Sequence, residues 1–360
     1  VAKAAMDTGV ARMPIADMEA YKHGLAQRLD PTAAMMQRVQ TVVRRAPRCI
    51  AFAEGEEPAV IRAAYAFQEL GLGRAVLVGR EETVRANMRQ VGVPENAALK
   101  IVNARLSSHN EEYAEYLYKR QQRFGFLQRD IQRMVNQDRN VFAACMVACG
   151  HADGMVTGVT RNYATALDDV LKVIDPARGE RVMGMSIVLM KGRTLFISDT
   201  AVAEFPDPEE LAQITLQSAA MARQFGATPR VALLSHSTFG NPKMERSEKI
   251  REAVSILDRR EEVEFEYEGE MNVDVALNPN MRELYPFSRL TEAANVLVMP
   301  ALHSSSIATS LLATAGGATV IGPVLTGLAK PIQIAPLGGA VSDIVTYATL
   351  AAFQAAEGEA

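Results

Sequence analysis

Short apolar segments alternate with longer amphipathic segments along most of the chain. Runs such as "AVLVG" (75–79) and "VALL" (231–234) are typical of buried strands, and the segments between them have helical periodicity. Continuous apolar strands separated by helices predict parallel sheets that helices cover on both faces. The segment "VMGMSIVLMKGRTLFISDTAV" differs, because two apolar runs flank a turn at Lys191 and Gly192. It predicts an antiparallel hairpin, and therefore a mixed sheet.

Length and composition narrow the class of protein. The 360 residues suffice for two α/β domains, and 48% hydrophobic with 22% charged residues is ordinary for a soluble globular protein. The formal net charge is -4, and no lysine or arginine block suggests a nucleic-acid partner. No apolar run reaches membrane-spanning length, and the first residues have no signal-peptide pattern. We therefore expect neither a membrane nor a nucleic acid as a partner.

Three cysteines do not make a disulfide framework, which favours a reducing cytoplasm. Cys145 and Cys149 lie four residues apart with His151 close by, so a metal site is conceivable. Buried helix cysteines are the favoured interpretation, because no second ligand pair has zinc spacing. We therefore predict no metal site.

In parallel sheets, ligands bind beyond the carboxyl ends of the strands, so the loops after strands hold the candidate residues. Ser237, Thr238 and Asn241 follow one strand, where they could bind an anion or cap the next helix. Thr160 and Arg161 follow another, where Arg161 could bind a phosphate or lie on the surface. In the loop after a further strand, a histidine such as His303 is more often structural than a base. The serines at 304–306 are equally open to a capping or a ligand role.

The segment "LAKPIQIAPLGGAVSDIV" (328–345) has the layout of an anion site without its chemistry. A Gly-Pro turn precedes an acid, Asp343, that opens an apolar helix, but the turn Pro336–Ala340 has no cation, hydroxyl or nucleophile. Lys330 precedes it and is a candidate for coenzyme phosphates or an ordinary surface lysine. No phosphate loop with the G-x-x-x-x-G-K-[ST] pattern exists, which argues against nucleoside triphosphate chemistry.

Several segments, in order and spacing, give the chain a resemblance to the phosphate acetyltransferase family from about Ala51 to the C-terminus. They are "ADGMVTG", "FISDTAV", "VALLSHST", "ANVLVMP" and "GPVLTGLAKPIQI" followed by "SDIV". The resemblance implies two α/β domains with a cleft between them, a dimer, and transfer of an acetyl group between coenzyme A and phosphate.

The same resemblance implies that the catalytic groups are lost. Active members have approximately the pattern S-R-G-x-S-x-x-D before the last helix. In this chain Pro336 stands for the first serine, Leu337 for the arginine and Ala340 for the second serine. Only the acid of the pattern, Asp343, is retained. A further family arginine falls at Asp168. No catalytic residue is expected, and a retained fold without catalysis suggests a sensor of acetyl-CoA or a related acyl-CoA. The expected ligand-binding residues are Thr160, Arg161, Ser237, Thr238, Asn241, Lys330, Leu337, Gly338 and Asp343.

The first residues, "VAKAAMDTGVARMPIADMEAY", resemble instead the end of the catalytic region of bacterial malic enzymes. Hybrid malic enzymes carry a phosphotransacetylase-like C-terminal domain, so the chain is expected to regulate an NADP-dependent malic region in the same polypeptide. NADP and Mg²⁺ or Mn²⁺ are expected there, and no cofactor in this chain. The expected divisions are a tail at 1–29, one domain at 30–155 plus 326–360, and a second at 156–325.

Two alternatives stay open. The chain could be an active phosphate acetyltransferase with a substituted turn, or a module whose role is oligomerisation alone. A homo-oligomer, at least a dimer, is expected in each case.

Overall fold

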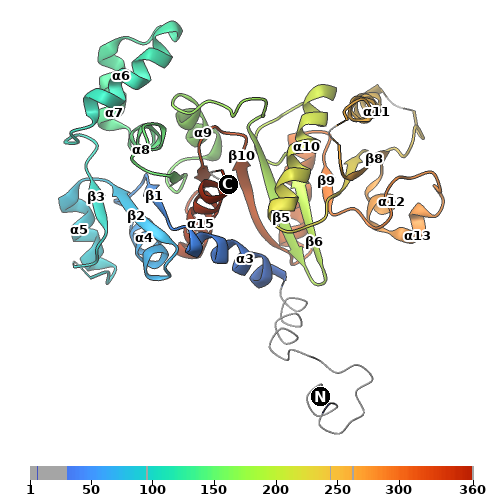
Figure 1. Cartoon of the computed structure of the whole chain (residues 1–360), viewed down its shortest axis with the longest axis horizontal. Coiled ribbons are helices and arrows are strands. Elements are labelled where there is room, and N and C mark those ends of the chain that lie inside the picture. The colour runs from blue at the N-terminus through green and yellow to red at the C-terminus, as the bar shows by residue number, and fades with distance from the viewer. Residues whose placement is uncertain (1–5, 7–30, 95, 244, 262, 359–360) are drawn as a thin grey trace.

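The strands form two separate sheets, one in each half of the molecule (Figure 1). The computed structural model describes Met6 and residues 31–94, 96–243, 245–261 and 263–358. The predicted α/β fold with mixed, mainly parallel sheets is confirmed. The expected tail at 1–29 lies outside the described residues, apart from Met6.

The first sheet has five strands, all parallel, in the order β11-β4-β1-β2-β3. Its central strand β1 ends in the fully buried residues Ile50, Ala51 and Phe52, as the continuous apolar run requires of a strand covered on both faces. The strands are β1 (Arg48–Phe52), β2 (Gly73–Val78), β3 (Lys100–Val102), β4 (Gly154–Thr157) and β11 (Ile332–Ile334).

The second sheet has six strands in the order β10-β5-β6-β9-β7-β8. The predicted hairpin is confirmed, since β5 and β6 pair antiparallel and Gly192 has a φ of 75° in their turn. Strands β6, β9, β7 and β8 run parallel, so their carboxyl ends lie at one edge. The strands are β5 (Met183–Met190), β6 (Arg193–Ser198), β7 (Arg230–Leu234), β8 (Glu266–Met271), β9 (Val296–Val298) and β10 (Thr319–Thr326).

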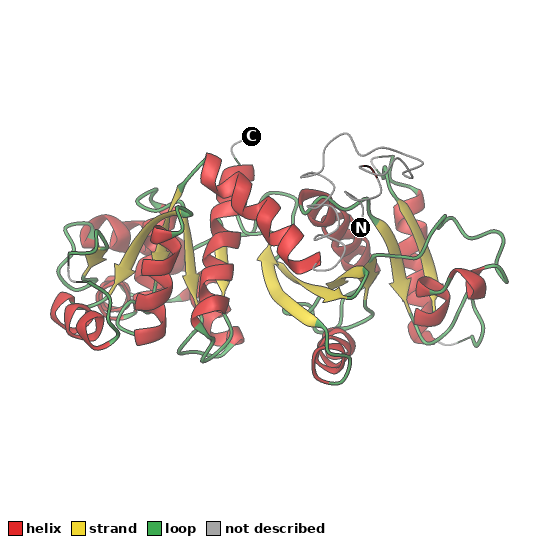
Figure 2. Ribbon diagram, turned by 90° about the horizontal axis from the view of Figure 1, so that it is seen from below, coloured by secondary structure: helices red, strands yellow, loops and turns green. Residues whose placement is uncertain are grey.

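Helices pack along the strands of both halves (Figure 2). They are α3 (Pro31–Arg45), α4 (Pro58–Glu69), α5 (Glu81–Gln90), α6 (Asn110–Gln121), α7 (Gln128–Gln137), α8 (Arg139–Ala148), α9 (Tyr163–Leu171), α10 (Pro208–Gln224), α11 (Glu245–Asp258), α12 (Val273–Leu277), α13 (Pro279–Arg282), α14 (Leu302–Thr314) and α15 (Val341–Glu357), with a 3₁₀ turn η1 at Gln122–Phe124. None of the helices in the described part of the chain is long and apolar enough to cross a membrane.

Local sequence explains where several helices begin. Helix α10 starts after Asp207, whose Oδ1 accepts a hydrogen bond from Glu210 N at 2.8 Å while Glu210 Oε2 accepts one from Asp207 N at 2.9 Å. This reciprocal pair satisfies two backbone amides that a helix start leaves free. Helix α14 begins at Leu302, so its first turn reaches into the loop after β9.

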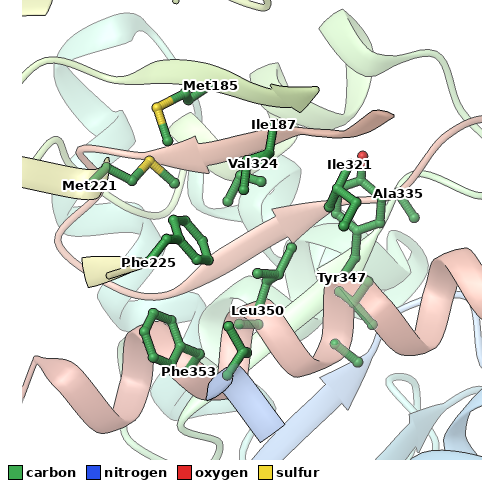
Figure 3. Close-up of a cluster of buried hydrophobic side chains, with 14 of the residues drawn as sticks. Met185, Ile187, Met221, Phe225, Ile321, Val324, Ala335, Tyr347, Leu350 and Phe353 are labelled. Atoms are coloured by element: carbon green, nitrogen blue, oxygen red, sulfur yellow. The ribbon is translucent and has the colours of Figure 1, made fainter. Parts of the chain in front are cut away.

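A shared core joins the two halves. Leu350 and Phe353 of α15 face Phe225, at the end of α10, and Val324 of β10 (Figure 3). The rings of Phe225 and Phe353 stack with centroids 5.7 Å apart. Burying a large apolar side chain contributes about 1.5–3 kcal/mol. Because α15 also packs on β1 and β4, this core fixes the first sheet against the second.

Candidate functional site

The loops at the carboxyl end of the first sheet meet around Glu54, two residues after the end of β1. Glu54 is buried, and its Oε1 accepts a hydrogen bond from Thr160 Oγ1 at 3.4 Å. The turn after β11 joins the same edge, because Gly338 N donates to the carbonyl oxygen of Val159 at 2.9 Å. The structure therefore brings together Thr160 and Gly338, two of the residues that the sequence singled out.

Burial raises the pKa of Glu54, and hydrogen bonds from Gly158 N, Thr160 and Thr157 offset only part of that rise. A second acid, Asp199 directly after β6, behaves in the same way. Burial raises its pKa although the backbone amides of Ala203, Gly184, Ala201 and Val202 donate to its carboxylate. Both acids organise strand-end loops through hydrogen bonds.

The turn after β11 presents an apolar side chain to solvent. Leu337 is 65% exposed, and Gly338 has a φ of 66°, in the left-handed region that glycine tolerates. Asp343 is exposed, and its Oδ2 accepts a hydrogen bond from Ala340 N at 3.0 Å. The retained acid therefore fixes the first turn of α15. Pro336, Leu337 and Ala340 supply no side-chain donor.

Arg161 lies beside this edge but is already paired with two acids. Its Nη1 donates to Asp138 Oδ2 at 2.9 Å and to Asp169 Oδ2. Burial lowers the pKa of Arg161, but the hydrogen bond and charge of Asp138, together with Asp169, raise it overall. Asp169 is buried, whereas its neighbour Asp168 is exposed. A phosphate would have to compete with two carboxylates for this guanidinium.

A pocket of about 870 Å³ opens at the carboxyl ends of three strands of the second sheet. Strands β7, β8 and β9 lead into it, and α11 and the start of α14 line it as well. Its lining residues are Phe205, Leu234, Ser235, His236, Lys249, Ile250, Asn272, Val273, Met299, Pro300, Ala301, His303 and Ser304.

The loop after β7 is anchored under this pocket by a buried acid. Glu270 Oε1 accepts hydrogen bonds from Ser237 Oγ at 3.0 Å, Gly240 N at 2.8 Å and Arg251 Nη1 at 3.2 Å. Ser237 is only 1% exposed, so its hydroxyl is occupied inside the protein. The lining serine of this loop is Ser235.

Thr238 and Asn241 close a tight turn in the same loop. Each donates its amide to the carbonyl oxygen of the other, at 3.0 and 3.1 Å. Thr238 Oγ1 also accepts a hydrogen bond from Asn272 N at 3.1 Å, and Asn241 is exposed at the tip. Their positions shape the loop next to the pocket, and neither residue lines it.

Lys330 is separated from the other predicted site residues. It precedes β11, at the amino end of the strand, whereas the turn with Leu337 follows the carboxyl end. Lys330 is exposed and lines a smaller hollow of about 230 Å³ near Glu180, Gln224 and the end of α15. The structure therefore does not bring Lys330 together with Thr160, or with the loop after β7.

Sequence patterns missed three polar or aromatic contributors to the pocket. Lys249 lies inside a helix, Asn272 follows a strand with several acids, and Phe205 lies in the long loop after β6. The rule that ligands bind at strand carboxyl ends could have identified Asn272. Nothing local marks Lys249, whose Nζ donates to the carbonyl oxygen of Pro206 at 2.9 Å.

Comparison with known proteins identifies a family over most of the chain. The model of the "Phosphate acetyl/butaryl transferase" family matches residues 34–352. Among curated proteins, the NADP-dependent malic enzyme of Rhizobium meliloti is 55% identical over 99% of the chain and 47% of its own length. The probable NADP-dependent malic enzyme of Rickettsia prowazekii is 43% identical, over 99% of the chain and 48% of its own length. The chain thus spans about half the length of these relatives.

Among solved structures, a phosphotransacetylase from Streptococcus pyogenes superposes with a TM-score of 0.85 at 28% identity. The match covers 91% of the chain and 99% of that structure. The described fold is therefore similar to a complete phosphotransacetylase.

Proposed function

Because the chain belongs to the phosphate acetyl/butaryl transferase family, we propose that it binds acetyl-CoA or a related acyl-CoA without transferring the acyl group. We further propose that this binding regulates the conversion of malate to pyruvate and CO₂ by an NADP-dependent malic region in a longer polypeptide. The similarity to two NADP-dependent malic enzymes supports the second step. NADP and Mg²⁺ or Mn²⁺ would bind in that other region.

The observation that carries the proposal is the turn after β11. Transfer of an acyl group to phosphate develops negative charge, which positioned donors must stabilise. Here the exposed side chain is that of Leu337, and Asp343 bonds to the backbone of its own helix start. The nearby cation Arg161 is paired with Asp138 and Asp169. The turn at 336–340 has the sequence layout of an anion site but contains no cationic side chain of its own.

The pocket of the second sheet has the chemistry that an acyl-CoA requires. Leu234, Ile250 and Met299 form apolar wall for a pantetheine arm, and Phe205, 64% exposed, offers a ring face for a base. Lys249 supplies a positive charge whose hydrogen-bond acceptor, a carbonyl oxygen, does not neutralise it. The start of α14 also lines the pocket, although the amides of Leu302 and Ser304 already donate to the carbonyl oxygens of Glu204 and Ala301.

Calorimetric titration of the purified chain with acetyl-CoA tests the binding step. We expect saturable binding that weakens by about 10- to 100-fold in Lys249→Ala, since a charge-assisted hydrogen bond contributes about 1.5–3 kcal/mol. Lys191→Ala, in the exposed hairpin turn, is the matched control and should bind as the wild type does. Lys330→Ala tests the smaller hollow instead. Absence of both heat and thermal shift at millimolar acetyl-CoA would refute the proposed ligand.

The rival function is an active phosphate acetyltransferase. The similarity to the phosphotransacetylase from Streptococcus pyogenes over nearly its whole length favours it. The two functions differ in one measurable property, turnover of acetyl-CoA with phosphate.

A further inference from the structure

Two histidines and one glutamate gather between the start of α6 and the turn after α8, and none of them lines the large pocket. His109 Nδ1 lies 3.1 Å from Glu112 Oε2, and His151 Nε2 lies 3.9 Å from the same oxygen. One ligand atom from each of the three residues lies within 4.8 Å of the others. The histidine rings are 4.0 Å apart between centroids. Three potential metal ligands therefore converge on one point.

Two of the three separations are close to those of ligands around one small ion, and the shorter one is also a hydrogen-bond distance between His109 and Glu112. Two ligand atoms about 2.0–2.1 Å from a tetrahedral zinc ion lie about 3.3 Å from each other. The 3.1 Å and 3.9 Å separations bracket that value. Small side-chain rotations of Glu112 and His151, which are partly exposed, would close the remaining difference.

The three residues are supplied by two independent backbone elements. His109 immediately precedes α6, and Glu112 follows within its first turn, where residues three apart share a face. His151 lies after α8, where its amide donates to the carbonyl oxygen of Met146 at 2.8 Å. Gly150 before it has a φ of 78°, which suits the left-handed end of a helix. His151 is therefore delivered from a turn whose backbone is fixed.

A buried tyrosine orients His151. Tyr113 is 1% exposed, its ring packs edge-on against Phe142 with centroids 5.2 Å apart, and its Oη lies 2.7 Å from His151 Nδ1. When Nδ1 carries the proton and donates to this oxygen, Nε2 keeps its lone pair and points toward Glu112. Metal-binding histidines in proteins are commonly fixed by such a bond on the other ring nitrogen.

We propose that His109, Glu112 and His151 form a zinc site, with Tyr113 as a positioning residue. Two imidazoles and one carboxylate suit Zn²⁺, whereas Ca²⁺ and Mg²⁺ prefer oxygen ligands alone. Three protein ligands leave the fourth position for water or an external group. The proposal differs from the sequence-based prediction of no metal site. That prediction concerned Cys145, Cys149 and His151, whereas the proposed site combines His151 with His109 and Glu112. Neither cysteine belongs to the three-residue group.

The ion would fasten a projecting part of the molecule. Helices α6 and α7 extend away from the first sheet at the end of the molecule (Figure 1). A zinc ion held by His109 and Glu112 on one side and His151 on the other would tie the start of α6 to the turn between α8 and β4. The inference is independent of acyl-CoA binding, because none of its residues lines the large pocket.

The test uses the whole chain, stripped with a chelator and titrated with zinc alone. We expect one zinc per chain with a dissociation constant of about 1 µM or tighter, and a melting temperature that rises with zinc. His109→Ala and Glu112→Gln should each weaken binding by at least about 10-fold. Glu111→Gln, an exposed acid on the same helix, is the matched control and should bind like the wild type. Each variant should melt like the wild type in chelator, which shows that it folds.

Tyr113→Phe separates orientation from packing, because it keeps the ring and removes the hydroxyl. We expect zinc affinity about 10- to 100-fold weaker, as for other groups that orient metal ligands. Cobalt titration provides a spectroscopic readout, since visible absorption of Co²⁺ reports the coordination geometry. A dissociation constant above about 100 µM would overturn the site. So would binding that Glu111→Gln weakens as much as Glu112→Gln does.

Discussion

The backbone amide of Gly338 donates a hydrogen bond to the carbonyl oxygen of Val159 at 2.9 Å. This bond fixes the turn after β11 against the loop after β4, and it involves no side chain. The turn can therefore keep its place at the strand edge when the side chains beside Gly338 change. Leu337 is exposed, so we expect its position to accept other side chains at little structural cost.

We expect the purified chain to lack phosphate acetyltransferase activity. Removing one strong transition-state contact typically lowers the rate by about 10²–10³-fold. The family resemblance implies that two or more such contacts are lost at Pro336, Leu337 and Ala340. The measurement is acetyl phosphate formation from acetyl-CoA and phosphate. Turnover of about 1 per second or more would support the rival function and refute this one.

Leu337→Arg serves as the accompanying variant. The new guanidinium would stand alone, because Pro336 and Ala340 still supply no hydroxyl and Asp343 remains bonded to Ala340 N. We expect it to leave activity at the background rate. Recovery of ordinary turnover by this single change would mean that the rest of the catalytic set is intact.

The order of strands and helices was predictable because burial leaves a periodic signal in the sequence. The hairpin at Lys191 and Gly192 is an example, with two apolar runs around a turn. Side-chain partners were not predictable, because they come from distant segments. Ser237 follows a strand as a ligand residue would, yet Glu270 and Ser247 bury its hydroxyl. Lys330 belongs to a promising segment but lies at the opposite end of its strand.

Ser237→Ala should lower the stability of the chain more than its affinity for acyl-CoA. The substitution leaves buried acceptors on Ser247 and Glu270 with one donor fewer, at a cost of about 1–3 kcal/mol. Ser304→Ala is the matched comparison, since Ser304 lines the pocket and is only partly buried. Urea unfolding and calorimetry on both variants provide the check. The structural role is wrong if Ser237→Ala weakens binding strongly while its unfolding midpoint is unchanged.

Glu54→Gln should gain stability relative to the wild type as the pH rises above about 4.5. Burial raises the folded-state pKa of Glu54 above its ordinary value of 4.5. Protonated Glu54 therefore stabilises the folded wild type. This stabilisation is fully present below pH 4.5 and is lost as the pH rises through the folded-state pKa. Glutamine stays neutral and keeps an oxygen to accept from Thr160. Melting temperatures of both proteins across the acid-to-neutral range test the trend.

Glu56→Gln is the control with the opposite sign. Hydrogen bonding to Arg80 lowers the pKa of Glu56 below 4.5, although partial burial opposes this shift. The ionised Glu56 therefore stabilises the fold above pH 4.5, and this stabilisation is lost as the pH falls through the folded-state pKa. The stability of Glu56→Gln relative to the wild type should therefore fall as the pH rises. Parallel curves for Glu54→Gln and the wild type would contradict a raised pKa of Glu54 in the folded state.

Helix α3 is the described element best placed to carry a signal toward the segment before it. Val39 and Val43 are fully buried in the core shared by the two sheets, and α3 packs against both α15 and β5. Figure 1 shows it beneath α15, extending toward the second half. Helix α3 is described as Pro31–Arg45, and the residues before it, apart from Met6, lie outside the described residues.

We therefore expect acyl-CoA binding to alter malic activity in a longer polypeptide through α3. A regulator needs two states that its ligand binds unequally, and a coupling of about 1–3 kcal/mol would change affinity by about 5- to 150-fold. The measurement is malic activity with and without acetyl-CoA for the wild type and for a Gly-Ser replacement of residues 28–34, which removes the stiff start of α3. An alanine replacement of the same residues keeps helix propensity, so its malic activity should still respond to acetyl-CoA. Lys249→Ala should need a higher acetyl-CoA concentration for the same change in malic activity.

If the Gly-Ser variant responds like the wild type, the coupling does not pass through residues 28–34, but the proposal that the chain binds acyl-CoA is unaffected. If acetyl-CoA leaves the wild-type activity unchanged at every malate concentration, the regulatory function itself is refuted.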